Sequence, residues 1–172
     1  MEPAALSKQT HKAGNFYRAD ISSLASETNI GRLVKEVYSS MNRTMARNVA
    51  PLGLTAMQWL PLVAMRFKNL NTPAELARHT GVDTGAMTRT LDRLEAKGFL
   101  TRQRCENDRR VVKLELTETG RIAVDGILPA VADTLNQHLS GFNQAEFNTL
   151  FSLLRRMADN GQQGEGNASR GT

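Results

Sequence analysis

The sequence is poor in the residues that build metal centres, disulfides and membrane spans. Among 172 residues there are one cysteine, Cys105, and three histidines that lack the spacing of metal ligands. A single cysteine excludes an internal disulfide and a zinc site made of several thiolates. No apolar run approaches the roughly 18 residues that cross a bilayer, and residues 1–20 lack the apolar core of a signal peptide. We therefore expect a cytoplasmic protein without membrane contact and without a metal or other cofactor.

The chain also lacks the groupings that carry enzymatic chemistry. It has no nucleophile paired with a base, no glycine-rich phosphate loop and no metal cluster, which argues against a small hydrolase or transferase. Aromatic residues make up 5% of the sequence, and the predicted basic face has none on which RNA bases would stack. The sequence therefore predicts a binding protein rather than an enzyme, and favours DNA over RNA.

Positive charge is concentrated in the middle of the chain. Residues 66–113 hold 11 Lys and Arg against six Asp and Glu, whereas residues 114–172 hold four against seven. Such a basic block is either a solvated surface or a face that binds phosphates, because Lys and Arg displace the counterions condensed on nucleic acids. Charge alone leaves both interpretations open.

Hydrophobic periodicity predicts a mainly α-helical fold with one β-hairpin, in the order ααααββαα. Thr72, Asp83, Thr117 and Asn143 are predicted N-caps, and Pro61 predicts a kink or a broken turn in the second helix. The expected helices cover about residues 30–45, 55–67, 73–80, 84–97, 118–139 and 144–157, and the expected strands cover residues 99–104 and 111–116.

Two short helices joined by a tight turn and followed by a hairpin form a winged helix-turn-helix. In this arrangement the second helix enters the major groove, led by its N-terminal residues. Its predicted inner face carries Met87, Leu91 and Leu94, and Arg89 is the best candidate for a bidentate contact with guanine. The alternative is a solvent-facing helix whose arginines pair with Asp92 or Glu95. The candidate DNA-binding residues are Thr84, Gly85, Thr88, Arg89 and Arg93 on the helix, and Arg109 and Arg110 at the tip of the hairpin, where Asp108 would orient an arginine.

Two stretches resemble the MarR (multiple antibiotic resistance regulator) family. Residues 85–100 (GAMTRTLDRLEAKGFL), together with residues 74–77 (AELA), resemble the helix-turn-helix of that family. Residues 107–120 (NDRRVVKLELTETG) resemble its D-x-R…L-T-x-x-G wing signature. The resemblance extends over about residues 29–159. It implies that Arg110 is the wing arginine with Asp108 as its partner, and that the first, fifth and sixth helices form a dimerisation region.

A homodimer is also expected from the sequence itself. The fifth and sixth helices carry apolar stripes that must be buried, and a two-fold partner is the commonest solution; an intramolecular helical cap on a monomer is the alternative. We therefore expect a pseudo-palindromic operator. The predicted organisation is a partly disordered arm at residues 1–28, a dimerisation helix at 29–50, the DNA-binding domain at 51–117, dimerisation helices at 118–159 and a disordered tail at 160–172.

The resemblance further implies a pocket for a small aromatic effector, such as a phenol or an aromatic carboxylate. The candidate ligand-binding residues are Tyr38, Met57, Trp59 and Val63, with Arg43 or Arg66 to pair with a carboxylate; these apolar residues are otherwise ordinary core. The sequence thus predicts a ligand-responsive DNA-binding regulator, with repression as the expected sign. The alternatives are a redox-sensing regulator that uses Cys105, whose pKa nearby arginines would lower, and a winged helix that only assembles with other proteins.

Overall fold

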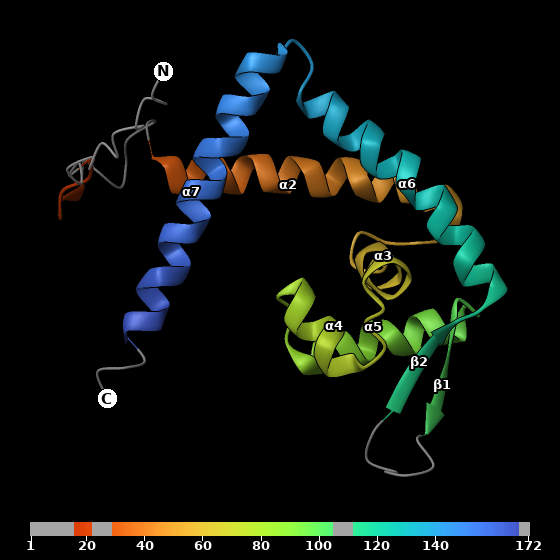
Figure 1. Ribbon diagram of the computed structural model, residues 1–172. Helices are drawn as coiled ribbons and strands as arrows, with labels where there is room; N and C mark the ends of the chain where they lie inside the picture. Colours follow the sequence, from red (N-terminus) through yellow and green to blue (C-terminus); the bar gives the residue numbers. More distant parts are fainter. Residues whose placement is uncertain (1–15, 22–28, 105–111, 169–172) are drawn as a thin grey trace, which may run out of the picture. The chain divides into compact units, whose positions relative to one another are not determined.

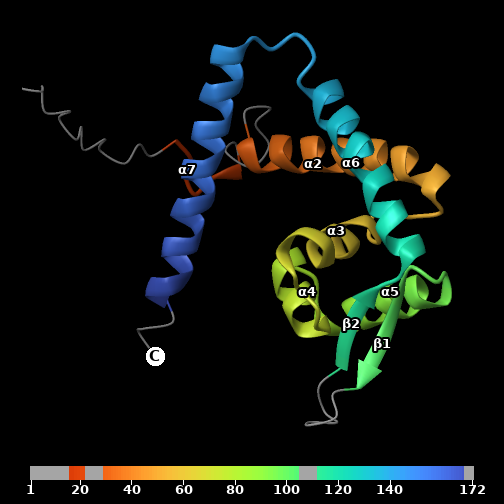
Figure 2. The same ribbon diagram turned by 45° about the vertical axis from the view of Figure 1, so that its right-hand side comes forward.

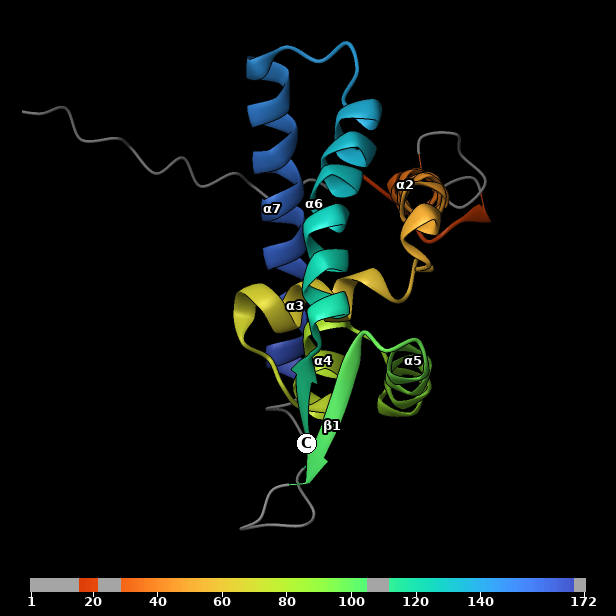
Figure 3. The same ribbon diagram turned by 90° about the vertical axis from the view of Figure 1, so that its right-hand side faces the viewer.

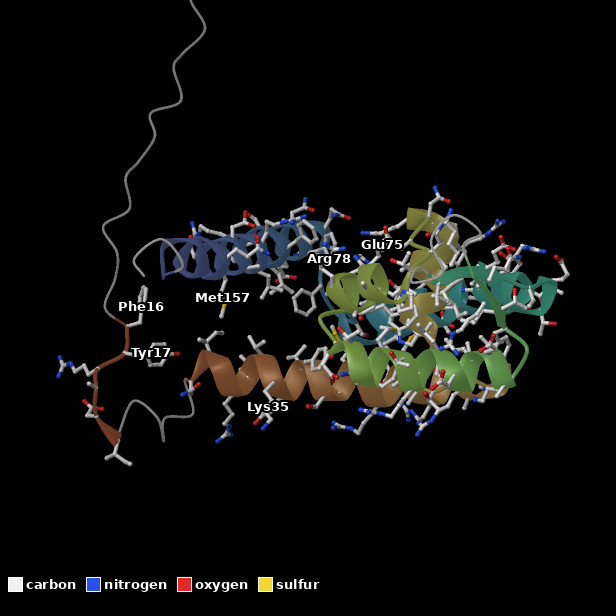
Figure 4. The ribbon with its side chains drawn as sticks, turned by 90° about the horizontal axis from the view of Figure 1, so that it is seen from below. Phe16, Tyr17, Lys35, Glu75, Arg78 and Met157 are labelled. Atoms are coloured by element: carbon white, nitrogen blue, oxygen red, sulfur yellow. The ribbon has the colours of Figure 1, made fainter. Side chains whose placement is uncertain are left out.

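The computed structural model describes residues 16–21, 29–104 and 112–168. The chain divides into two compact units, residues 1–39 and 40–172, and α2 (Ile30–Val49) continues from the first unit into the second. In the first unit the hydroxyl of Tyr17 accepts the Ile30 N–H at 2.8 Å, and the Asn29 side chain accepts the Arg32 N–H at 3.0 Å. These two acceptors satisfy N–H groups in the first turn of α2, where helical partners are missing. Figure 4 labels Tyr17.

The second unit contains a cluster of three helices, α3 (Trp59–Lys68), α4 (Pro73–Thr80) and α5 (Thr84–Ala96), preceded by the short 3-10 helix η1 (Ala50–Leu52) (Figure 1). The sequence predicts a second helix from about residue 55 to residue 67, with a kink or a broken turn at Pro61. The structure corrects its start, because residues 56–58 form a turn ahead of the helix. The helix begins at Trp59, so Pro61 lies in its first turn, where a helix needs no N–H donor. Pro61 is also buried.

The helix ends follow the predicted capping signals. Thr72 and Glu75 form a capping box at the start of α4, Gly81 ends α4 with φ 68°, and the Asp83 side chain accepts the Ala86 N–H at 2.9 Å. A positive φ at the end of a helix costs glycine little, whereas other residues are strained there. Only two residues, Gly81 and Val82, therefore separate α4 from the cap of α5.

The hairpin consists of β1 (Leu100–Arg104) and β2 (Val112–Leu116), paired antiparallel with Leu100 opposite Leu116 and Arg104 opposite Val112. Figures 2 and 3 show β1 running away from the end of α5 and β2 returning toward the start of α6. On the far side of β2, the Leu114 N–H donates to the Asn71 carbonyl oxygen at 2.7 Å. The hairpin is thus tied to the loop between α3 and α4.

One hydrophobic core holds these elements together. Leu62 of α3, Leu76 of α4, Leu91 and Leu94 of α5, and Leu100 of β1 have at most 1% of their surface exposed. Burial of apolar surface contributes about 25 cal/mol of free energy per Å² and is the main stabilising contribution in such a core. The apolar face of α5 is therefore held against α4 and β1, and its opposite face is left to solvent.

The two last helices are α6 (Glu118–His138) and α7 (Gln144–Ala168). The sequence assigns residues 118–159 to dimerisation helices, which stays a prediction. Val124 and Ile127 of α6 are fully buried in the hydrophobic core of this chain. The sequence also predicted a disordered tail from residue 160, whereas α7 continues to Ala168. Helix propagation adds one hydrogen bond per residue, and glycines weaken it without ending it as proline would.

Candidate nucleic-acid interface

The exposed face of α5 carries the residues that were predicted to read DNA. Thr84, Gly85, Thr88, Arg89 and Arg93 are all exposed, while the inward positions are filled by the buried residues Met87, Leu91 and Leu94. This separation follows from the 3.6-residue period, which places residues three and four apart on one side. The face is continuous over three turns of the helix.

The N-terminal end of α5 is shaped by Asp83, Gly85 and Arg89. A Cβ built on Gly85 would lie 3.2 Å from Asp83 Oδ1 and 3.7 Å from Arg89 Nη1, so the guanidinium of Arg89 extends back over the first turn. Helical side chains lean toward the N-terminus, which accounts for this direction. The arginine therefore adds its charge to the positive end of the helix dipole.

Two threonines of α5 bond to their own helix. The Thr88 hydroxyl donates to the Thr84 carbonyl oxygen at 2.8 Å, and the Thr90 hydroxyl donates to the Ala86 carbonyl oxygen at 3.0 Å. The exposed Thr88 thus presents its methyl group and an acceptor lone pair outward. A thymine methyl group or a base amino group is the kind of partner that suits this surface.

The acidic residues of α5 form ion pairs with β1, whereas its arginines form none within the described chain. Among the described residues, Arg89 and Arg93 have no carboxylate within ion-pair distance, whereas Asp92 pairs with Arg102 of β1 at 2.7 Å, and Glu95 pairs with the same guanidinium at 2.8 Å. The alternative in which the arginines of α5 neutralise Asp92 or Glu95 is therefore not what the structure shows. Both arginines are left for another anionic group.

Comparison with known proteins decides the family. The MarR family model matches residues 54–112. The multiple antibiotic resistance protein MarR of Escherichia coli is 35% identical over 129 residues, which is 74% of this chain and 90% of that protein. The chain belongs to the MarR family. Within this family it has the winged helix fold that its sequence predicted.

Solved structures of MarR-family proteins have the same fold. A mutant MarR of Escherichia coli in complex with operator DNA superposes with a TM-score of 0.71 at 31% identity, covering 81% of this chain and 99% of that one. BpsR of Bordetella bronchiseptica, described for the regulation of its DNA binding by 6-hydroxynicotinic acid, has a TM-score of 0.69 at 26% identity. The match covers 75% of this chain and 98% of BpsR.

The predicted site residues at the tip of the hairpin, Cys105, Asp108, Arg109 and Arg110, lie outside the described residues. Their roles stay predictions from the MarR resemblance. The strands on both sides of the tip are described, and the exposed Lys113 of β2 adds to the charge of the hairpin.

The candidate effector residues of this MarR-family protein are not brought into one described pocket. Met57 is exposed, Trp59 and Val63 are half-buried against the core, and Arg43 is exposed on α2. Tyr38, also exposed, belongs to the first unit. Arg66 lines an open hollow of about 310 Å³ together with Asn69, Asn71, Glu115 and Arg121, over the apolar residues Met65, Leu70, Leu114 and Leu116. The effector site stays a prediction.

Sequence reasoning missed two residues that fix α5. Gln58 is buried, and its Oε1 accepts the Thr55 N–H at 3.1 Å and Lys97 Nζ at 3.0 Å; Lys97 also donates to the Gly53 carbonyl oxygen. A buried side-chain amide is stable only when it is hydrogen-bonded. Because Lys97 is the C-cap of α5, these bonds hold the end of the helix against the start of α3. No local pattern indicates a contact across 39 residues.

The described residues add two negative findings. None of their helices combines the length and the apolar character that crossing a membrane requires. Within the same ranges, no three His, Cys, Asp or Glu side chains come together as ligands of a metal ion.

Proposed function

We propose that this MarR-family protein is a transcriptional regulator that binds a specific operator in double-stranded DNA through α5. The observation that carries the proposal is the exposed face of α5, which presents Thr84, Thr88, Arg89 and Arg93 without an acidic partner in the described chain. A capped helix of 13 residues with a basic, threonine-rich face fits the major groove. Arg109 and Arg110 at the hairpin would enter the adjacent minor groove.

The comparisons support this proposal. The mutant MarR that superposes on this chain was solved with operator DNA, and the model for the family spans the helix-turn-helix and most of the hairpin. The net charge of +5 favours association with phosphates at low salt.

The active form in this proposal is a homodimer. On α7 the large apolar residues are exposed, among them Phe151, Leu153, Leu154 and Met157 (Figure 4 labels Met157), and α7 has no buried residue in its described part. A helix of 25 residues with an apolar stripe and no cover needs a partner surface, and a second copy supplies it with two-fold symmetry. Two α5 helices would then meet half-sites about 10 base pairs apart.

A small aromatic ligand, such as a phenol or an aromatic carboxylate, would release the protein from the operator and so end repression. BpsR supports this part, because a hydroxynicotinic acid regulates its DNA binding. A ligand can shift DNA affinity only if it binds one spacing of the two recognition helices better than the other. Titration with 6-hydroxynicotinic acid and salicylate should therefore lower operator affinity and raise the melting temperature; no effect on either would contradict ligand control.

The test of the main proposal starts with selection of bound fragments from a genomic library, followed by substitution of Arg89. Arg89→Ala should weaken binding to the selected duplex by about 1–3 kcal/mol and relax the requirement for one base pair. Arg89→Lys is the matched control: it keeps the charge and hence the salt dependence, but it lacks the planar fork that reads guanine. Equal sequence preference in all three proteins would contradict the assignment of α5 as the reading helix.

A further inference from the structure

Arg102 of β1 joins the hairpin to α5 through two hydrogen bonds to Glu95 and an ion pair with Asp92. Its Nη1 lies 2.7 Å from Asp92 Oδ1 and 2.8 Å from Glu95 Oε2, and its backbone N–H donates to Glu95 Oε1 at 3.1 Å. The side chain of Arg102 is only 26% exposed, compared with 62% for Arg32 in the ion pair on α2. This contact is therefore less screened by water than an ordinary surface pair.

The backbone bond distinguishes this contact from a simple ion pair. In the β1–β2 ladder Arg102 is opposite Leu114, and its N–H points away from β2 to the Glu95 carboxylate. The two oxygens of Glu95 thus hold the main chain and the side chain of the same strand residue. The Glu95 carboxylate of α5 binds both the backbone N–H and the guanidinium of Arg102 in β1. Two bonds to one carboxylate leave β1 little freedom to rotate relative to α5.

The position of this link matters for the orientation of the hairpin. Arg102 lies in the middle of β1, and Asp92 and Glu95 lie in the C-terminal half of α5. Each strand residue adds about 3.3 Å of length, so a small rotation at Arg102 becomes a larger displacement further along the hairpin. A helix and a hairpin that enter adjacent grooves of one duplex tolerate little displacement relative to each other.

The link also controls the charge of the surface that faces DNA. Asp92 is exposed and next in sequence to Arg93 on α5. Without Arg102, the carboxylates of Asp92 and Glu95 would stand uncompensated on the helix that is proposed to bind DNA. Neutralisation of Asp92 by Arg102 and alignment of the hairpin by Arg102 therefore both favour DNA binding.

We propose that Arg102 is a positioning residue that fixes the hairpin relative to α5, and so raises the preference for operator over other DNA without reading a base itself. The proposal rests on the proposed function, because it concerns the geometry with which the same surface binds DNA. It predicts that Arg102 and Glu95 act as one unit.

The experiment is a double-mutant cycle with Arg102→Met and Glu95→Gln, measured as the ratio of affinities for the selected operator and a scrambled duplex. Glu95→Gln removes a negative charge, so charge alone would strengthen binding to any duplex. Positioning predicts instead that each single variant lowers the operator preference roughly three- to tenfold, and that the double variant lowers it no further than the worse single variant. The salt dependence of binding should not change, because no phosphate contact is lost.

The matched control is Gln103→Ala, on the next residue of β1. Gln103 Nε2 donates to Glu115 Oε2 at 2.9 Å within the hairpin, so this variant removes a hydrogen bond without touching α5 and should keep the preference within about twofold. Arg102→Lys, which retains the charge but not the fork, serves if Arg102→Met does not fold; it should lose part of the preference.

Three outcomes would overturn the inference. Full operator preference in Arg102→Met and Glu95→Gln would show that the link is irrelevant to DNA binding. A salt dependence that falls by about one phosphate in Arg102→Met alone would make Arg102 a phosphate contact. Losses that add in the double variant would show that the two residues act separately. If the wild-type protein itself shows no preferred duplex, the proposed function fails rather than this inference.

Discussion

Gly120 provides the sharpest test of how the winged domain is packed. It lies in the first turn of α6, where a Cβ would be 2.0 Å from the Phe99 carbonyl oxygen and 3.3 Å from Leu116 Cδ2. A separation of 2.0 Å is far inside van der Waals contact, and the atom in the way is backbone. The substitution Gly120→Ala can therefore be accommodated only if α6 moves away from the beginning of the hairpin.

The cost of that movement can be worked from the contacts it disturbs. Thr117 N–H donates to the Phe99 carbonyl oxygen at 3.1 Å, and the Thr117 hydroxyl donates to the Gly98 carbonyl oxygen at 2.6 Å. Each lost hydrogen bond costs about 0.5–1.5 kcal/mol, and overpacking costs about 1–3 kcal/mol. Alanine regains at most about 1 kcal/mol through its helix propensity. We expect Gly120→Ala to lower the free energy of unfolding by about 2–4 kcal/mol.

Two other helical glycines make the comparison controlled. The three atoms nearest to a Cβ on Gly126 all belong to the movable side chain of Leu52, the closest at 2.8 Å, and a Cβ on Gly161 would meet nothing within 4 Å. Urea denaturation at one fixed protein concentration should therefore rank the alanine variants, with Gly120 the most destabilised, Gly126 within about 1 kcal/mol of wild type, and Gly161 unchanged or up to about 1 kcal/mol more stable. A Gly120→Ala protein as stable as the Gly161→Ala protein would refute the packing described here.

Two further predictions concern the acid stability and the oligomeric state. The Thr72 hydroxyl, followed by the Asn71 backbone, holds the pKa of the Glu75 carboxyl below its ordinary value of 4.5. As the pH falls, the unfolded chain therefore takes up this proton at a higher pH than the folded chain does. The stabilisation of the folded state is complete above pH 4.5 and is lost as the pH falls through the lower pKa of the folded state. The melting temperature should drop less steeply below pH 4.5 in Glu75→Gln, and an identical slope would contradict the capping-box geometry. Leu154→Asp should shift the sedimentation coefficient from dimer to monomer and weaken operator binding, whereas Ser152→Asp, which adds the same charge to the opposite side of α7, should do neither; a monomeric wild type would contradict the dimer.

The local features of the fold could be predicted because their signals are local. Thr72, Asp83 and Thr117 cap helices where the sequence predicted them, since an N-cap depends on a side chain and an N–H only two or three residues away. The alternation of α5 into a buried and an exposed face followed from its apolar spacing in the same way. These features were enough to position the residues proposed to read DNA.

Features that depend on distant partners could not be predicted. The pairing of Asp92 and Glu95 with Arg102 requires the chain to reverse after Gly98, and the bond from Lys97 to Gln58 spans 39 residues. The assignment of α6 to the dimerisation region stays a prediction, because periodicity shows that a helix has an apolar stripe but does not show which surface covers it. The burial of Val124 and Ile127 in the winged domain is visible only in three dimensions.

The most direct measurement is the dissociation constant of the wild-type protein for its selected duplex in the presence of excess scrambled competitor, at about 0.15 M salt. If α5 reads bases, the selected duplex should bind at least about a thousandfold more tightly than the competitor. Binding that the competitor abolishes in proportion to its amount, with no duplex preferred, would contradict the central claim that the exposed face of α5 recognises a DNA sequence.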